Sequence, residues 1–271
     1  MTTPRPTLAD RVALDHHRRR ARDEALFLHR AARADIEDRL GEITRRFDDV
    51  AIISPFAHIW DGFGARIVDE AEVLDLEPCQ HDLVIHALCL HWADDPVGQL
   101  VQCRRALRPD GLFIGTLLGG QTLNELRSAL AEAEVAATGG LSPRVLPMGE
   151  IRDLGALLGR AGFALPVADA STTTVSYTDA TALMHDLRAM GEANALADRN
   201  RSTPARDIFS RLNRDYAVNF AQADGRIPAT FEAITLTGWA PSADQPQPLR
   251  PGSAQTRLAQ ALGTEEFGPG H

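Results

Sequence analysis

The stretch "DLVIHALCLHWADDPVGQLVQCRRALRPDGLFIGTLL", residues 82–118, decides the fold class of this chain. It begins with an apolar run over residues 82–86, continues with a helical pattern over residues 97–107 and ends with an apolar run over residues 111–118. Pro96 suits the first turn of a helix, and Pro109-Asp110-Gly111 is a turn that ends the helix and starts the next strand. One βαβ unit takes about 30 or more residues, so the stretch predicts an α/β fold.

Short apolar runs and longer helical patterns also alternate along the rest of the chain. Residues 50–54 and 66–68 are predicted strands before the βαβ unit, and the β-branched runs 172–177 and 229–241 predict strands after it. Apolar residues at helical spacing predict helices over residues 16–40, 121–137, 148–163, 180–194 and 204–221. We therefore expect a helical segment over residues 1–48, one domain over residues 49–240, and an extended or partly disordered tail over residues 241–271.

The composition limits the function classes. A formal net charge of −9 argues against a nucleic-acid partner, because such proteins present a basic face. The three cysteines form no CxxC pair, and the histidines at positions 81, 86 and 91 are spaced wrongly for a three-histidine site, so no metal is expected. No apolar run of about 18 residues and no signal-peptide core appears, so we expect no membrane-spanning segment and a reducing, cytoplasmic location.

Several separated motifs resemble one protein family. They are "LHW" at residues 90–92, "PDGLFIG" at 109–115, "GGQTLNELR" at 119–127, "LSPRV" at 141–145, "DLGALLGRAGF" at 153–163, "DLRAMGEAN" at 186–194 and "IPATFEAITLTGW" at 227–239. On these motifs the chain resembles the class I S-adenosylmethionine-dependent methyltransferases. Within that superfamily it resembles the methyltransferase-like assembly factors of respiratory complex I and, less closely, the malonyl-carrier-protein methyltransferases of biotin synthesis.

The resemblance implies a fold, a cofactor and a partner. The fold is a Rossmann-like sheet of seven strands with helices on both faces, its last strand antiparallel, and S-adenosylmethionine is bound at the carboxyl ends of the first strand and its neighbours. On this basis the cofactor pocket would contain Ser54, Asp69 or Glu70, Ala87 and Leu88. The assembly-factor branch implies modification of an arginine on a complex I subunit, described as hydroxylation, and therefore a protein partner.

The first strand departs from the family pattern. In this fold a glycine-rich turn after the first strand lets the backbone approach the cofactor. Here residues 50–54 are followed by Pro55 and Phe56, and no GxGxG occurs. The "DGFG" of residues 61–64 lacks the flanking strand and helix of a cofactor loop and is predicted to be a plain turn. We expect Pro55, Phe56 and Trp60 to fill the cofactor space, so that binding of S-adenosylmethionine is impaired or absent.

The chain is also short between its first and fourth strands. Asp82 follows Ile53 by 29 positions. The family fits two more strands with their helices there, although one βαβ unit alone takes about 30 residues. We therefore expect a sheet that is truncated in its N-terminal half. The segment around Asp69 and Glu70 aligns either with the second strand, where one of them would bind the cofactor ribose, or with the third; we favour the third.

Two candidates for catalysis follow the fourth strand, at the sheet edge where this fold binds substrate. His91 would act as a general base and Trp92 would form a pocket wall; alternatively, both are structural and pack against the following helix. Gly120 would shape the mouth of the pocket. The alternative is that Thr122 and Glu125 form a capping box that starts a helix there.

Arg144, Glu192 and Asn194 are candidates for substrate binding, because they lie in matched motifs outside the core sheet. Glu192 would pair with a guanidinium group of a protein substrate. The alternative is that these residues are solvated surface residues.

The sequence thus favours a methyltransferase-like protein of the complex I assembly-factor type with a degenerate cofactor loop. It would bind a partner subunit from a cytoplasmic position peripheral to the membrane-bound complex, and would either modify that subunit weakly or escort it. Its cofactor would be S-adenosylmethionine by family resemblance, or none. The alternative is an active S-adenosylmethionine-dependent methyltransferase acting on a small or carrier-bound carboxylate.

Overall fold

The chain forms one unit over residues 1–241 and a second over residues 242–271. The computed structural model describes residues 7–245 and residue 263, so most of the predicted tail lies outside the described residues. Among the described residues no helix combines the length and apolar character needed to cross a membrane. No group of three or more His, Cys, Asp or Glu residues in that part of the chain is placed to hold a metal ion.

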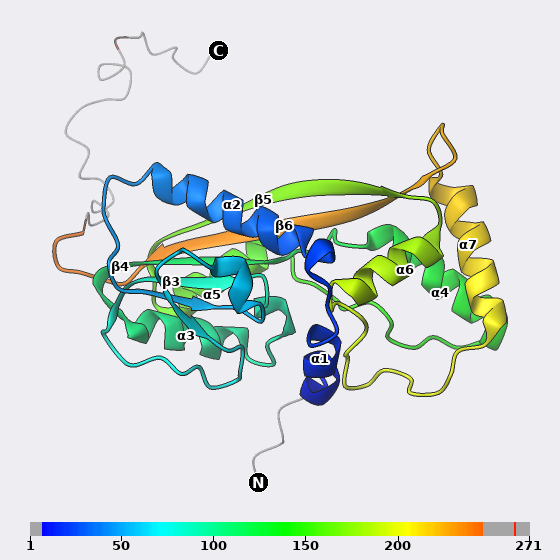
Figure 1. Cartoon of the computed structure of the whole chain (residues 1–271), viewed down its shortest axis with the longest axis horizontal. Coiled ribbons are helices and arrows are strands. Elements are labelled where there is room, and N and C mark those ends of the chain that lie inside the picture. Colours follow the sequence, from blue (N-terminus) through cyan, green and yellow to red (C-terminus); the bar gives the residue numbers. More distant parts are fainter. Residues whose placement is uncertain (1–6, 246–262, 264–271) are drawn as a thin grey trace, which may run out of the picture. The chain divides into compact units, whose positions relative to one another are not determined.

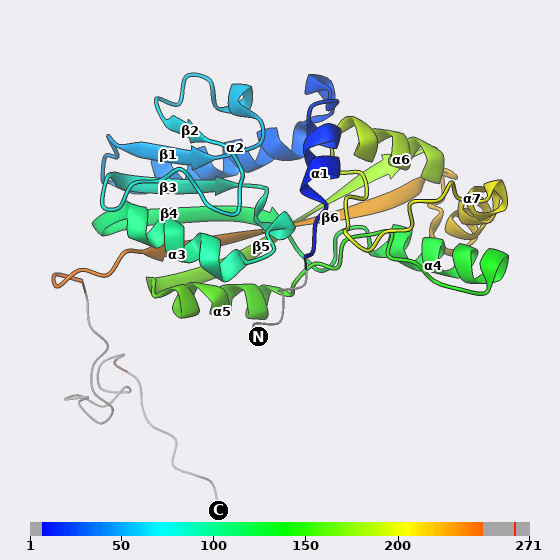
Figure 2. The same ribbon diagram turned by 90° about the horizontal axis from the view of Figure 1, so that it is seen from below.

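The first unit is built on one mixed sheet of six strands (Figures 1 and 2). The strand order is β2-β1-β3-β4-β6-β5, with β1 to β4 mutually parallel and β6 antiparallel to both of its neighbours. This sheet confirms the predicted Rossmann-like α/β class. The strand bounds are β1 Val50–Ile53, β2 Arg66–Val68, β3 His81–Ala87, β4 Leu107–Leu118, β5 Ala164–Tyr177 and β6 Ile227–Trp239.

Helices cover both faces of the sheet. Helix α2 (Phe27–Gly41) lies on one face, and α3 (Pro96–Ala106) and α5 (Ile151–Ala161) lie on the other (Figures 1 and 2). Alternate residues of each central strand enter the two cores. Ile85 belongs to the core beneath α2, whereas its neighbour Val84 belongs to the core that also holds residues of α3 and α5. In β4, likewise, Ile114 belongs to the first core and Phe113 to the second. Strands β3 and β4 are therefore buried on both faces, which is typical of a parallel sheet.

The predicted βαβ unit is present with one local difference. Asp95 caps α3 by accepting a hydrogen bond from the Gly98 backbone N–H at 2.9 Å, as its place before Pro96 predicts. Strand β4 begins directly after the helix, at Leu107, four residues earlier than predicted. The predicted turn persists as an irregularity inside the strand, because Asp110 has a φ of 63° and the register with β3 shifts there.

The N-terminal half of the sheet is shortened, as the spacing predicts. Only a single 3₁₀ turn, Ala57–Trp60, connects β1 to β2, and β2 pairs directly with β1. In the doubly wound strand order the second strand neighbours the first. The favoured assignment of the segment around Asp69 and Glu70 to the third strand is therefore wrong, because β2 lies next to β1, in the position of the second strand.

The plain turn predicted for residues 61–64 is present. Gly62 and Gly64 have φ values of 80° and 76°, and no helix follows them.

The last two strands extend beyond the sheet and carry a second group of helices. Strand β6 pairs with β4 only from Ala233 onward, whereas it pairs with β5 from Ile227 to Trp239. The extra length forms a two-stranded ribbon that packs with α4 (Asn124–Thr138), α6 (Ala180–Ala189) and α7 (Arg206–Phe220). We call this ribbon end and its three helices the cap (Figure 1).

The capping box predicted for α4 is wrong. The Thr122 hydroxyl donates to the Glu232 carbonyl at 3.2 Å and accepts from the Glu232 N–H at 3.1 Å. Glu125 accepts hydrogen bonds from the hydroxyl and the N–H of Thr230. Both side chains therefore bind the backbone of β6 rather than the start of their own helix, and they join α4 to the ribbon.

The single helix predicted over residues 16–40 is two helices. Helix α1 spans Arg11–Arg18, α2 spans Phe27–Gly41, and a short 3₁₀ turn over Asp23–Ala25 lies between them. Arg22 is extended, and its N–H donates to the Ala189 carbonyl of α6 at 2.8 Å. The helix is thus interrupted at Arg22, where the backbone bonds to α6, although the pattern of charged and apolar residues continues through this position.

Burial in the cap predicts a clear stability difference between two positions of α7. Leu212 is fully buried, whereas Val218 is 77% exposed on the same helix. Leu212→Ala should lower the free energy of unfolding by about 2–5 kcal/mol, because it removes buried methyl groups and leaves a cavity. Val218→Ala should change it by less than about 0.5 kcal/mol. Urea unfolding monitored by circular dichroism measures both, and equal losses would contradict the described packing of α7.

Candidate functional site

The candidate site lies at the carboxyl edge of the sheet, where β1 and β3 are adjacent. The chain leaves these two strands in opposite directions across the sheet, toward β2 and toward β4. Open α/β sheets bind their ligands in the crevice at such a switch point. Three chain segments enter this crevice: the exits of β1, β2 and β3.

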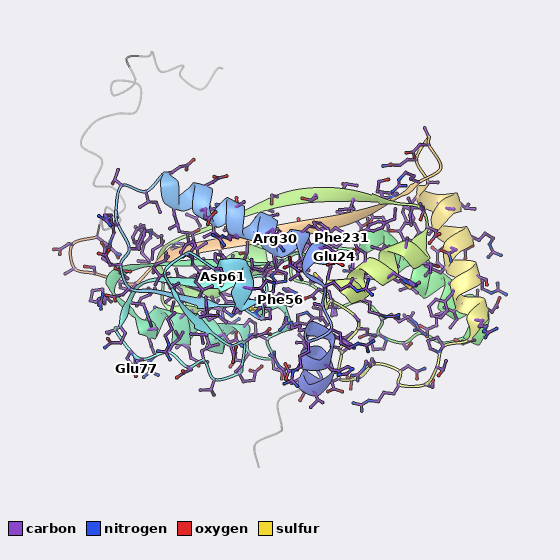
Figure 3. All side chains as sticks on the ribbon, in the orientation of Figure 1. Glu24, Arg30, Phe56, Asp61, Glu77 and Phe231 are labelled. Carbon is purple, nitrogen blue, oxygen red and sulfur yellow. The ribbon has the colours of Figure 1, made fainter. Side chains whose placement is uncertain are left out.

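The exit of β1 is filled by side chains from its own loop. The Ser54 hydroxyl is buried and accepts a hydrogen bond from the Phe56 N–H at 3.2 Å. The Phe56 ring is 6% exposed and meets the His29 ring edge-on at a centroid distance of 4.7 Å (Figure 3 labels Phe56). Phe56 and Trp60 belong to the core cluster beneath α2. The polar and aromatic groups that follow β1 are thus engaged with the protein's own core.

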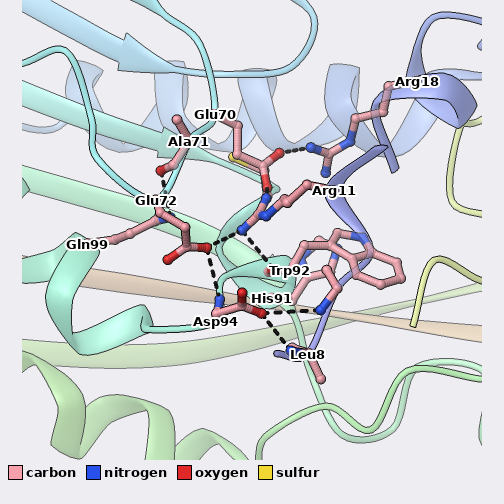
Figure 4. A network of polar contacts seen from close by, with 12 residues as sticks. Leu8, Arg11, Arg18, Glu70, Ala71, Glu72, His91, Trp92, Asp94 and Gln99 are labelled. Atoms are coloured by element: carbon pink, nitrogen blue, oxygen red, sulfur yellow. Dashed lines mark hydrogen bonds and ion pairs between the residues drawn. The ribbon is translucent and has the colours of Figure 1, made fainter. Parts of the chain in front are cut away.

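The exit of β2 carries a buried carboxylate that is bound by two arginines. Asp69 is exposed, whereas the Glu70 side chain is only 3% exposed. One Glu70 oxygen accepts from Arg11 Nη1 at 2.8 Å, and the other forms an ion pair with Arg18 Nη1 (Figure 4). The Arg18 side chain is itself only 7% exposed. A buried carboxylate is stable only when it is paired, and here helix α1 supplies both partners.

The exit of β3 turns sharply into the crevice. Ala87 and Leu88 are both buried, and Leu88 has a φ of 51°. Beneath them, His86 Nε2 lies 2.8 Å from Gln99 Oε1, and His86 Nδ1 lies 3.5 Å from the Cys89 sulfur. Burial lowers the pKa of His86 to about 4 and raises the pKa of Cys89 to about 12. Both groups are therefore neutral at pH 7, and their contacts with each other and with Gln99 support the loop from below.

His91 and Trp92 meet Glu192 on the cap side of the crevice. Trp92 Nε1 donates to Glu192 Oε2 at 2.7 Å, and His91 Nε2 lies 3.6 Å from the same oxygen. The Leu118 N–H donates to His91 Nδ1 at 3.4 Å, so Nε2 is the ring nitrogen that faces the carboxylate. The sequence predicted these residues for separate catalytic and substrate roles, and the structure brings them together.

The electrostatic environment keeps Glu192 ionised. Burial by itself would raise the pKa of Glu192, but the neighbouring His91, Arg18 and Trp92 side chains outweigh burial and lower the pKa to about 2. The Glu192 Oε1 atom lies 3.9 Å from Arg18 Nη2. Arg18 therefore lies between two buried carboxylates, Glu70 and Glu192.

The N-terminal segment holds these contacts in place. The Leu8 and Ala9 N–H groups donate to one Asp94 oxygen at 2.7 and 3.2 Å (Figure 4 shows the Leu8 bond). Arg11 also binds Glu72 at 2.6 Å and the Trp92 carbonyl at 3.0 Å. Sequence reasoning missed Arg11 and Arg18, because an arginine-rich amphipathic pattern is typical of a solvated helix and carries no signal for a distant partner.

A cavity of about 270 Å³ lies between the crevice and the cap. Four predicted residues line it: Trp92, Arg144, Glu192 and Asn194. Gly120 does not line it, because that glycine lies against the Glu150 carboxylate. The remaining wall is mainly apolar and includes residues of α4 and α6, Phe209 of α7, Phe231 of β6, Leu28 of α2, Leu118 of β4 and the segment 145–148.

Arg144 and Asn194 are held by polar contacts in the cavity wall. Arg144 Nη2 lies 2.6 Å from Glu134 Oε1, and this hydrogen bond is the main cause that lowers the pKa of Glu134 to about 2. Asn194 Nδ2 donates to the Pro143 carbonyl at 2.9 Å, and its Oδ1 accepts from the Leu196 N–H at 3.0 Å. Arg144 and Asn194 are therefore not merely solvated surface residues, as the alternative expectation had it. They line the cavity, and their polar groups are bound by other parts of the protein.

The fold and the motifs place the chain in a known class of proteins. A family model described as a methyltransferase domain matches residues 61–115, a segment that begins after the exit loop of β1. The chain belongs to the class I S-adenosylmethionine-dependent methyltransferase superfamily. Within it, the chain is related to the proteins named arginine-hydroxylase NDUFAF5.

Individual relatives give the extent of this similarity. The chain is 38% identical over 200 residues to arginine-hydroxylase NDUFAF5 of Dictyostelium discoideum, which covers 73% of this chain and 46% of that protein. It is 36% identical over 179 residues to a malonyl-[acyl-carrier protein] O-methyltransferase of Laribacter hongkongensis, which covers 66% of this chain and 58% of that protein. The chain thus spans about half the length of the curated relatives it matches. A solved Bacillus halodurans structure described as a methyltransferase aligns with a TM-score of 0.49 at 13% identity, covering 77% of this chain and 99% of that one.

The comparisons correct one expectation. The NDUFAF5 relatives are named as mitochondrial proteins, so the predicted cytoplasmic location is wrong. The prediction rested on the absence of a signal-peptide core and on cysteines that form no CxxC pair. Neither signal distinguishes the cytoplasm from another reducing compartment.

The depressed pKa of Glu192 predicts how the stability of the protein depends on pH. A carboxylate whose pKa falls from 4.5 to about 2 on folding stabilises the folded state above pH 4.5, and this stabilisation is lost as the pH falls toward 2. Glu192→Gln keeps an acceptor for Trp92 but removes the charge. It should therefore lower the free energy of unfolding by about 3 kcal/mol at pH 7 and by progressively less below pH 4.5.

The measurement compares urea unfolding of the wild type and the variant from pH 7 to pH 3. Glu77→Gln is the matched control, because Glu77 is exposed at the outer edge of the molecule (Figure 3) and its substitution should have no measurable effect. A stability difference between wild type and Glu192→Gln that does not change with pH would show that the charge of Glu192 is not responsible.

Proposed function

We propose that this chain is a methyltransferase-like protein of the complex I assembly-factor type that binds a partner subunit, and that its β1–β3 crevice does not hold S-adenosylmethionine. One observation carries the proposal: both oxygens of Glu70 are bound by arginines of the chain's own N-terminal segment. Glu70 follows the end of β2, the strand that neighbours β1, by two residues, and this is the region where the fold presents its acid to the cofactor ribose. The position of the cofactor's ribose contact is thus taken by Arg11 and Arg18.

The loop after β1 supports the same conclusion. A cofactor loop approaches its ligand closely only where glycine leaves space. Here Pro55 offers no N–H, the Phe56 N–H is used by Ser54, and the Phe56 ring belongs to the buried core. Methyl transfer needs the cofactor in place, so we derive no methylation step for this site.

The proposed partner-binding region is the cap side of the crevice. Glu192 is ionised and lies beside Trp92, in the wall of the cavity. A carboxylate beside an aromatic ring is suited to a guanidinium group, which pairs with the oxygens and stacks on the ring. The names of the NDUFAF5 relatives refer to arginine, which agrees with this choice of partner group.

A second candidate function is methylation of a small or carrier-bound carboxylate. The similarity to malonyl-[acyl-carrier protein] O-methyltransferases favours it, as does the position of Arg144 and Arg188 at the cavity. It requires a working cofactor pocket. It therefore predicts saturable binding of S-adenosylmethionine, which the first function does not.

Calorimetric titration with S-adenosylmethionine and with S-adenosylhomocysteine separates the two candidates. The wild type should give no saturable heat at concentrations typical of enzyme substrates, about 1 μM to 1 mM, because Arg11, Arg18 and Phe56 occupy the crevice. Glu70→Gln serves as the diagnostic variant. If the wild type binds in the micromolar range and Glu70→Gln weakens binding tenfold or more, then Glu70 holds the ribose and the proposal is wrong.

Partner binding is tested with purified complex I subunits and the wild-type protein immobilised on a sensor surface. We expect one subunit to bind, and Glu192→Gln to weaken that complex about tenfold or more, since charge-assisted hydrogen bonds contribute about 1.5–3 kcal/mol. Glu77→Gln should bind as the wild type does. Failure of every subunit to bind would overturn the partner-binding function. The mass of the bound subunit tests modification separately, because hydroxylation adds the net mass of one oxygen atom and methylation the net mass of one CH₂ group.

A further inference from the structure

The cavity beneath the cap shares Trp92 and Glu192 with the proposed partner-binding region, and the rest of its wall is mainly apolar. We propose that it is a binding site for a single aliphatic acyl chain of medium length, with the anionic end of the ligand at Arg188. The cavity measures about 270 Å³. Empty apolar volume destabilises a protein in proportion to its size, and well-packed cores leave few such voids. A persistent apolar cavity is therefore the usual form of a small-molecule site.

The wall of the cavity is suited to a hydrocarbon chain. Leu126, Leu130, Leu187 and Phe231 supply rigid apolar surface from three different elements, and these residues are all buried. Three methionines, at positions 148, 184 and 190, also line the cavity. Unbranched thioether side chains adapt to the shape of a flexible ligand, so the wall can follow a chain that has no fixed conformation.

The volume sets the length of the chain. An apolar cavity of about 150 Å³ accommodates one benzene molecule, with its six carbons. On the same scale, a cavity of 270 Å³ takes about ten carbons. A two-carbon or three-carbon acid would leave most of this volume empty.

The charges around the cavity select the sign of the ligand's polar end. Arg144 is paired with Glu134. Glu192 accepts a hydrogen bond from Trp92 and lies 3.9 Å from Arg18 Nη2, so Arg144 and Glu192 each have a partner within the protein. Arg188 lies on α6, is exposed, and has no ion-pair partner among residues 7–245. At the Arg188 end of the cavity the charge without an ion-pair partner is thus positive, and there it favours a carboxylate or a phosphate over an ammonium group.

The test is a calorimetric titration of the whole chain with saturated acids of six to fourteen carbons. Affinity should rise about fourfold with each added methylene group up to about ten carbons and then level off or fall, because the cavity is full. Decylammonium should bind more weakly than decanoate. A flat dependence on chain length, or tighter binding of decylammonium, would overturn the proposal.

Two pairs of variants locate the site. Met184→Trp should abolish decanoate binding by filling the cavity, whereas His185→Trp places the same bulk on the exposed neighbouring position and should leave binding unchanged.

The second pair tests the charge. Arg188→Ala should weaken the binding of decanoate about threefold without affecting the binding of decanol, because an exposed ion pair contributes little. Arg160→Ala, at an exposed position of α5, should affect neither ligand. If Met184→Trp still binds decanoate, the ligand lies outside this cavity and the proposal is wrong.

A third arm distinguishes the source of the acyl chain. Decanoate tests a free acid, and decanoyl-phosphopantetheine tests a carrier-bound thioester with a phosphate end. Both carry an aliphatic chain with an anion, so the proposal requires that at least one of them shows the Met184→Trp effect. These titrations contain neither S-adenosylmethionine nor a partner subunit, so their failure leaves the proposed function unaffected.

Discussion

Buried carboxylates at the carboxyl edge of the sheet set the main constraint on this structure. Glu70 and Glu192 leave water when the sheet and the cap fold, and an ionised carboxylate without a partner would cost several kcal/mol. Arg18 lies between them, and Arg11 completes the shell around Glu70. The N-terminal helix therefore packs into the crevice because the acidic groups require it. That packing brings Leu14 and Ala9 into a small apolar cluster with Trp92.

Helix α2 explains how the sheet remains a covered α/β sheet although its N-terminal half, around β1 and β2, is short. A parallel sheet needs both faces covered. Between β1 and β2 the chain supplies only a 3₁₀ turn, so α2, which precedes β1, covers the face above these strands. Phe56 and Trp60 pack into that same layer. The residues after β1 thus contribute to the core of the six-stranded sheet.

The fold was largely predictable from local signals, whereas the site was predictable only in part. The βαβ unit followed from the apolar pattern around Pro96, and residues 66–68 formed a strand as expected, because these signals are local. The partners of Glu70 depend on a contact between residues 59 positions apart, and no periodicity encodes such a contact. The same limit applies to Thr122 and Glu125, whose spacing fits a capping box but whose partners lie more than 100 positions away on β6. Trp92 and Glu192 were each selected from family motifs, and only the fold showed that they bind each other.

The long ribbon of β5 and β6 has a mechanical consequence. The same two strands run without a break from the central sheet into the cap, so the cap and the sheet share a hydrogen-bonded spine rather than a flexible loop. A hinge needs a few residues that can change their backbone dihedrals freely, and a paired ribbon does not provide them. Access to the cavity therefore depends on bending of the ribbon, or on the irregular segments 144–148 and 192–194, which contribute to the cavity wall. We therefore expect the cap to move relative to the sheet by gradual bending of the paired β5 and β6 strands, and not by rotation about a hinge.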